Sequence, residues 1–379
     1  MHGNRSNRTG GALLVCLLLG WGGGCRTPPV DQARNDFYAG RFTQAEQHLE
    51  TIPENNKDEV LFLMERGMIR HALHAYDPSS DDWRRAAERN AWLETYSISQ
   101  GATSLVSNDR VLPFRGAPFE MTLLYSFLAK NYLVQQNWDF AAISARNIIR
   151  LLEGRDGFPE VPYGRYMAGF CLALINDTGN AATQYRAINE IFEHDLIDPE
   201  TGRRPGAEAS LPGAPPPPEL VVFLAMGRMP TPQVAEYQAD GVPPHIEIII
   251  DDQHRDTAMF FDNTAGLMAA TRRRLVAKQL AKDISRIAIK ETIASSVESQ
   301  NDALGQLLRL LLFALEAPDD RCWETLPRWL AVARLPCPAD LESYTVVFQD
   351  QHGRQVTRTI TDPIVRRGNI FISFCRDLP

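Results

Sequence analysis

The richest run of chemically active side chains lies between residues 245 and 256. His245 and Glu247 alternate with apolar residues and would share one face of a strand, and four more candidates follow: Asp251, Asp252, His254 and Asp256. Imidazole nitrogens and carboxylate oxygens are common metal ligands, but this spacing matches neither a closed zinc site nor a calcium-binding EF-hand loop. A polar strand edge that runs into a loop explains the pattern better. We therefore predict no metal and no cofactor.

No other motif in the sequence offers catalytic chemistry. His71 and His74 lie one helical turn apart, but the glutamate of an HExxH zinc helix is missing. The chain has no GxSxG nucleophile elbow, no GxxxxGK[ST] phosphate loop and no GxGxxG after a strand. These patterns favour a protein that is not an enzyme.

Charge and composition narrow the class of partner. The 379 residues include 39 Lys and Arg against 47 Asp and Glu, a formal net charge of -8, and 44% are hydrophobic. This composition is typical of a globular protein. Broad capture of nucleic acid needs an excess of basic residues along the phosphates, so we expect no nucleic-acid partner.

The first residues carry an export signal. Arg5 and Arg8 precede an apolar run, ALLVCLLLGW, which is too short to span a bilayer and is followed by three glycines and Cys25. This end resembles the lipobox of bacterial lipoproteins, although Gly22 stands where a leucine is usual. The resemblance implies that residues 1–24 are a signal peptide and that Cys25 carries the lipid anchor, palmitate included. Because Arg26 follows where an aspartate would retain the protein at the inner membrane, it also implies the outer membrane, facing the periplasm.

Helical pairs are expected from residue 31 to residue 197, after a tether at 25–30. Apolar residues recur at helical spacing in 31–52, 119–153 and 163–192, with turns at Gly40, at residues 135–137 and at residues 177–179, and longer helices fill 57–75 and 81–105. Bulky residues on one helix face alanines on its partner. This pattern is similar to the tetratricopeptide repeat, whose stacked pairs expose a concave face suited to a protein partner.

A proline-rich segment, residues 198–218, separates this half from the rest. It includes the run Pro215–Pro218 and cannot form a packed element, so we interpret it as a linker between domains. Strands are predicted afterwards at 220–224, 246–250, 329–335, 344–348, 356–360 and 370–374. A helical insertion at about 262–317 interrupts them. The expected fold class is therefore α+β, with tetratricopeptide-like helical pairs followed by a small β-sandwich domain at 219–379.

The second half contains a row of basic residues and a group of cysteines, and each leads to a prediction. Basic residues recur every fourth position on one insertion helix, which favours a solvated face over a contact with lipid or cell wall: Arg274, Lys278, Lys282, Arg286 and Lys290. Cys322, Cys337 and Cys375 lie in the β region of an exported chain, where disulfides form. We predict one bridge, with Cys322 or Cys337 bonded to Cys375.

Two segments resemble a group of uncharacterised proteobacterial lipoproteins with tetratricopeptide-like helices. The first has the similar residues Asn108, Arg110, Arg115 and Glu120. The second contains the motif Arg-x-Trp-x-x-Leu-Pro at 321–327 and an Ala-Arg-Leu-Pro strand at 333–336. The group's Glu-Ala-Arg-Arg pattern is here Ser-Ala-Arg-Asn at 144–147, which keeps only Arg146. The resemblance implies an envelope protein with no assigned catalytic activity, and it marks these five residues of 108–146 as candidates for partner binding.

These observations support a non-enzymatic lipoprotein that acts as a protein-binding scaffold or assembly factor in the cell envelope. Its partners would be the membrane, through the lipid anchor, and a periplasmic or envelope protein. The alternative is a periplasmic metal-dependent enzyme that uses the cluster at 245–256.

Overall fold

The computed structural model describes residues 29–50, 56–99, 112–154, 156–206, 217–252, 254–277, 320–349, 353–361 and 364–377. Cys25, Asn108, Arg110, most of the helical insertion and part of the proline-rich segment lie outside these residues. None of the helices in the described ranges combines the length and apolarity needed to cross a membrane.

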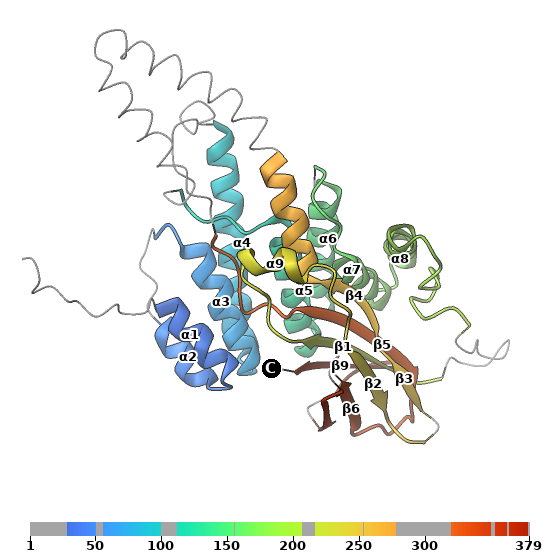
Figure 1. Cartoon of the computed structure of the whole chain (residues 1–379). Helices are drawn as coiled ribbons and strands as arrows, with labels where there is room; N and C mark the ends of the chain where they lie inside the picture. The colour runs from blue at the N-terminus through green and yellow to red at the C-terminus, as the bar shows by residue number, and fades with distance from the viewer. Residues whose placement is uncertain are drawn as a thin grey trace, which may run out of the picture.

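The first half consists of antiparallel helical pairs (Figure 1). Their bounds are α1 (Pro29–Tyr38) and α2 (Phe42–His48), α3 (Glu59–Ala72) and α4 (Tyr76–Ser99), α5 (Pro118–Val134) and α6 (Trp138–Glu153), and α7 (Pro162–Leu174) and α8 (Thr178–Phe192). Helix α1 therefore starts inside the expected tether. Its first residue is Pro29, a residue type that suits a helix start because the first N–H has no intrahelical partner.

The same turn joins the helices of every pair. A residue with positive φ follows the first helix, and it is Gly40, His74, Gln136 or Asn176 in the successive pairs. In each case the next N–H donates to the carbonyl five residues earlier, as Asn137 does to Tyr132 at 2.8 Å. This is the Schellman bond that ends a helix. The predicted helical pairs are thus confirmed, and they share one turn geometry at unequal spacings.

Small residues let the helices of a pair approach closely. Ala141, Ala142 and Ala145 are buried on α6. A Cβ atom at Gly169 on α7 would lie only 2.7 Å from the Tyr185 ring on α8. Alanines and glycines therefore make room for the bulky side chains that face them, as the sequence pattern predicts.

The second half is a sandwich of two sheets. The five-stranded sheet has the order β4-β5-β1-β9-β8, and the four-stranded sheet has the order β3-β2-β6-β7. Their bounds are β1 (Glu219–Met226), β2 (His245–Ile249), β3 (Arg255–Thr257), β4 (Met259–Asn263), β5 (Trp329–Pro336), β6 (Tyr344–Gln349), β7 (Gln355–Ile360), β8 (Val365–Arg367) and β9 (Ile370–Asp377). A short helix, α9 (Pro232–Gln238), follows β1, and residues 264–277 form the described start of the helical insertion.

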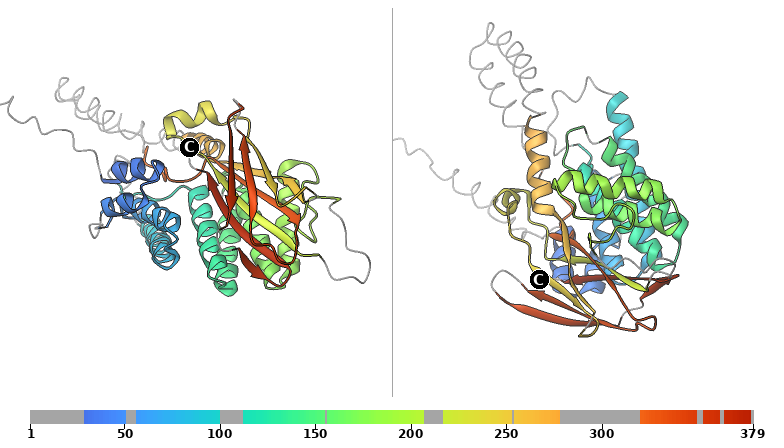
Figure 2. Two further views of the ribbon diagram at one scale, coloured as in Figure 1. Left: turned by 90° about the horizontal axis from the view of Figure 1, so that it is seen from below. Right: turned by 90° about the vertical axis from the view of Figure 1, so that its right-hand side faces the viewer.

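Helices, five-stranded sheet and four-stranded sheet form three layers (Figure 2). On β1, Val221 and Phe223 belong to the core shared with the helices. Leu220 and Val222 belong to the core between the two sheets. Because β1 is buried on both faces, its sequence is an unbroken apolar run instead of an alternating one. The α+β class and the sandwich are confirmed, and the helical half shares its core with the sheet.

Candidate functional site

The histidine and carboxylate cluster at 245–256 lies on the hairpin of β2 and β3. His245 is exposed on β2, and Glu247 is half-buried on the same face. At the turn, His254 Nδ1 lies 2.9 Å from Asp251 Oδ1. Across the described residues, no three histidine, cysteine, aspartate or glutamate side chains are placed to hold a metal ion. The geometry therefore gives the metal-enzyme alternative no support.

The candidate partner-binding residues separate into two kinds. Arg115 and Arg146 are exposed. Glu120 is buried, with only 1% of its surface accessible. It was expected to meet a partner, but its contacts are internal.

Glu120 joins the helical half to the C-terminal half. Its Oε2 accepts a hydrogen bond from Ala117 N at the start of α5, and its Oε1 accepts one from Trp323 N, both at 2.7 Å. Burial raises the pKa of this carboxyl to about 7, although both hydrogen bonds favour the charged form. The Trp323 ring is fully buried against Trp83 and Phe127, with centroids about 6 Å apart.

Glu65 on α3 binds the next residues of the same segment. Its Oε2 accepts from Thr325 Oγ1 at 2.5 Å, and its Oε1 accepts from Glu324 N at 3.0 Å. Arg34 on α1 donates to Glu65 Oε1 at 2.7 Å and to the Cys322 carbonyl at 2.7 Å. We call residues 321–327 the latch segment. The Arg-x-Trp-x-x-Leu-Pro motif is therefore a structural joint between α1, α3, α5 and the sheet.

The Ala-Arg-Leu-Pro motif at 333–336 also has a structural role. Arg334 on β5 forms a bidentate ion pair with Glu219 on β1, at 2.5 and 3.0 Å. The same guanidinium donates to the Thr201 carbonyl at 2.7 Å. Arg203 also reaches Glu219, at 2.8 Å. Residues 198–206, the described start of the expected linker, are thus packed onto the sheet.

The expected disulfide is not formed. Cys322 and Cys337 are buried free thiols, so neither is bonded to Cys375. Cys322 lies in the core shared with the helices, whereas Cys337 and Cys375 lie in the core between the two sheets. Cys375 of β9 is paired with Leu224, near one end of β1. The Cys337 N–H donates to the carbonyl of Pro218, which precedes the other end of β1. Strand residues rise about 3.3 Å each, so the two cysteines are roughly 20 Å apart, far beyond disulfide reach.

The concave face expected to hold a partner is occupied by the chain itself. Tyr163 and Phe170 on α7 pack against Phe223 of β1, with ring centroids 6.2 and 5.3 Å apart. Met68 on α3 meets Arg376 of β9. The first helix of each of these pairs is covered by the five-stranded sheet. The second helices α4, α6 and α8 are therefore the part of these pairs that a partner could reach.

Among the described residues of α4, α6 and α8, those of α6 form the most apolar outer face. Phe140 is 50% exposed and Ile143 is 48% exposed. They lie one turn apart, and the exposed Arg146 and Arg150 continue the same face. We call these four residues the α6 ridge. The corresponding face of α8 is polar: Asn180, Thr183, Arg186 and Glu190.

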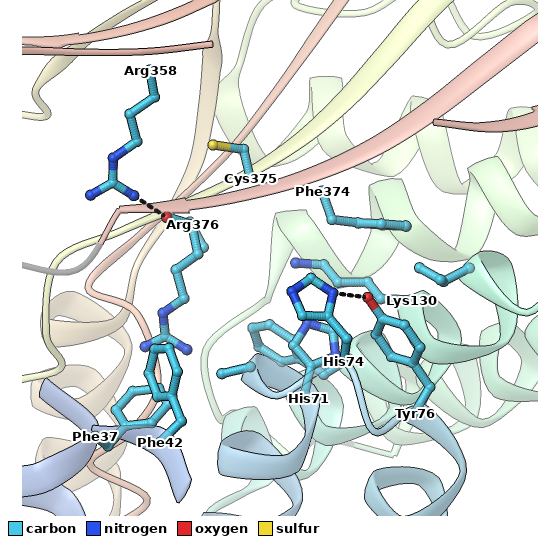
Figure 3. Close-up of a pocket in the computed structure, with 14 residues that line it drawn as sticks. Phe37, Phe42, His71, His74, Tyr76, Lys130, Arg358, Phe374, Cys375 and Arg376 are labelled. Carbon is cyan, nitrogen blue, oxygen red and sulfur yellow. Dashed lines mark hydrogen bonds between the residues drawn. The ribbon is translucent and has the colours of Figure 1, made fainter. Parts of the chain in front are cut away.

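A cavity of about 270 Å³ lies where α3, α5 and β9 meet (Figure 3). Its walls include the aromatic rings of Phe37, Phe127 and Phe374 and the cationic groups of Lys130 and Arg376. Lys130 is 2% exposed. Burial, and then the charge of Arg376, lowers the pKa of its ammonium to about 7. The sequence patterns do not predict this site, although a lysine inside the apolar run of α5 indicates a buried charge.

His71 forms part of the cavity wall in its neutral state. Its Nδ1 lies 2.6 Å from Asn131 Oδ1. The Asn131 amide nitrogen donates to Ser79 Oγ and Ser80 Oγ, so its oxygen is the acceptor and His71 Nδ1 carries the proton. Burial lowers the pKa of this imidazole to about 3. Neighbouring His74 lies 2.8 Å from the Tyr76 hydroxyl (Figure 3).

Comparison with known proteins shows limited similarity. The chain matches no protein-family profile and no curated protein. Solved structures that align with it include MamA of AMB-1, at 15% identity and a TM-score of 0.28, over 43% of this chain and 70% of that one. MamA of MSR-1 aligns at 13% identity with the same TM-score, over 43% of this chain and 74% of that one.

Proposed function

We propose that this protein is a non-enzymatic lipoprotein of the outer membrane, facing the periplasm, which binds an envelope protein through the α6 ridge. Cys25 supplies the lipid anchor. The observation that carries the binding proposal is the exposure of Phe140 and Ile143 on α6, while the face beneath the helical pairs is filled by the chain's own sheet.

The chemistry of the ridge defines the partner. Two apolar side chains are followed on the same face by the guanidinium groups of Arg146 and Arg150. Such a face fits an amphipathic segment whose apolar residues are flanked by carboxylates. The partner is therefore a protein with an acidic amphipathic helix.

Site-specific photocrosslinking in cells tests the ridge. A photoreactive residue at Ile143 should give one discrete adduct, and the linked peptide should carry aspartate or glutamate. Arg146→Glu should abolish the adduct through like-charge repulsion. Arg186→Glu, the same change on the polar face of α8, should leave it intact. An adduct that survives Arg146→Glu, or no adduct at Ile143, refutes this surface.

Lipidation has its own test. Cys25→Ala should lose incorporated palmitate and leave the membrane fraction. Cys16→Ala removes the other cysteine of the same end and should retain both properties. A Cys25→Ala protein that still incorporates palmitate contradicts the anchor.

A further inference from the structure

The cavity between α3, α5 and β9 combines apolar walls with positive charge. Phe37, Phe127 and Phe374 supply rings, and Lys130, Arg358 and Arg376 supply cations, while no aspartate or glutamate of the described residues lines it. Among the described residues, the wall itself therefore carries positive charges and no negative one.

Lys130 is the group that lacks a partner. The neighbouring cation Arg376 is already engaged, since it donates to the Thr325 carbonyl at 2.6 Å and lies over the Phe37 ring. Within the described structure, Lys130 forms no hydrogen bond and no ion pair. Its Nζ instead lies 4.3, 5.3 and 5.7 Å from the ring centroids of Phe127, Tyr163 and Phe374. Ring faces offset only part of the loss of hydration of a buried ammonium.

The surroundings specify the charge and shape of the missing group. One unpaired ammonium matches one negative charge. A phosphate dianion would need several N–H donors, whereas Arg376 already donates through Nη1 and Nη2 and has only its buried Nε without a partner. The aromatic walls favour a flat or short apolar body. The Arg358 side chain donates to the Arg376 carbonyl at 3.0 Å (Figure 3) and forms an ion pair with Asp377.

We propose that this cavity binds a small monocarboxylate with an aromatic or short aliphatic body, and that the carboxylate pairs with Lys130 Nζ. The apolar body lies among the phenylalanine rings. This site is separate from the α6 ridge and from the lipid anchor, and it stands if either of those proposals fails.

Calorimetric titration of the mature chain near pH 6 tests the site, with phenylacetate as probe and 2-phenylethanol as its uncharged analogue. Phenylacetate should bind with one-site stoichiometry and at least about tenfold more tightly than 2-phenylethanol. Lys130→Met should weaken phenylacetate binding at least about tenfold without changing the binding of 2-phenylethanol. Lys57→Met, which removes a lysine from the surface, should bind phenylacetate as the wild type does.

A second measurement needs no change at Lys130. Phenylacetate affinity of the wild type should fall as the pH rises from about 6 to about 9, because the lysine loses its proton. Among the other facing groups, His71 is already neutral over this range, because burial lowers the pKa of its imidazole to about 3. A His74→Gln protein should show the same fall, which excludes His74 as its source.

The proposal is overturned if phenylacetate does not bind the wild type, or if 2-phenylethanol binds equally well. It is also overturned if the affinity for phenylacetate is unchanged in Lys130→Met or constant over this range of pH.

Discussion

The buried carboxylate of Glu120 accepts a hydrogen bond from the backbone N–H of Trp323, a residue 203 positions later in the chain. This bond, with the contacts of Glu65, attaches the latch segment to the first helices of two successive pairs. The segment therefore links the sheet to the helices, in addition to the direct packing of α7 on β1.

Trp323→Ala should lower the free energy of unfolding by about 3–5 kcal/mol, because it empties a fully buried site next to Trp83 and Phe127. Urea unfolding followed by circular dichroism measures the change. Trp92→Ala is the matched control, since Trp92 is 51% exposed and its loss should cost no more than about 1 kcal/mol. Similar losses in both variants would show that the latch does not hold the fold.

Glu65→Gln should destabilise the protein by about 3 kcal/mol, because it leaves the buried guanidinium of Arg34 with a weakened partner. Glu236→Gln changes an ion pair with Arg273 in which both side chains are more than half exposed. That control should cost less than about 1 kcal/mol. Thermal and urea unfolding would contradict the prediction if the two variants were equally stable.

Asp262 should make stability depend on pH. Its Oδ2 accepts from Tyr163 N at the start of α7, and burial raises the pKa of its carboxyl from 3.8 to about 7. Between these values the folded state holds more protons than the unfolded state, so the free energy of unfolding falls as the pH rises from about 4 to about 7. Urea midpoints measured across this range should show the fall.

Asp262→Asn should reduce this slope, because asparagine keeps the acceptor without titrating. Glu120 contributes with the same sign, so adding Glu120→Gln should reduce the slope further. Asp240→Asn changes an exposed carboxylate and should leave the slope as in the wild type. An unaltered slope in the double variant would show that other groups cause it.

The cysteines of the described residues should remain thiols in the purified protein. Burial raises the pKa of the Cys171 and Cys322 thiols above the usual range, which suppresses the reactive thiolate. The number of free thiols titrated in denaturant should be the same before and after reduction of the purified protein. An increase of two on reduction would reveal a bridge and contradict the separation of Cys337 and Cys375 along the sheet.

Local patterns in the sequence predict most of the elements. The run at 329–335 becomes β5, and the spacing at 163–192 becomes α7 and α8. Both are readable because helical and strand periodicity follow from which side of an element is buried. The packing of helices on the sheet is a long-range property, and the only local sign of it is the unbroken apolar run of β1.

The candidate site is harder to predict from the sequence than the helices and strands are. Charged residues such as Glu120 and Arg334 attract attention in a sequence whether they meet a partner or stabilise a core, and only their burial distinguishes the two roles. On α6, Phe140 and Ile143 lie off the stripe of Ala141, Ala145 and Ile148 that the helix buries, so helical spacing alone already leaves them outside the core. Their importance as a surface becomes visible only when the sheet is seen to cover the other side of the helical pairs.

The position of β9 has a consequence for biogenesis. This strand, which follows every other element, lies between β1 and β8 inside the five-stranded sheet and carries Phe374 and Arg376 into the cavity. The parallel pairing of β9 with β1 joins segments that are far apart in the chain, so this part of the sheet can close only after β9 has been made. Until then a nascent chain would expose the side of α5 that faces Phe374, so we expect a chaperone that shields this side to assist folding.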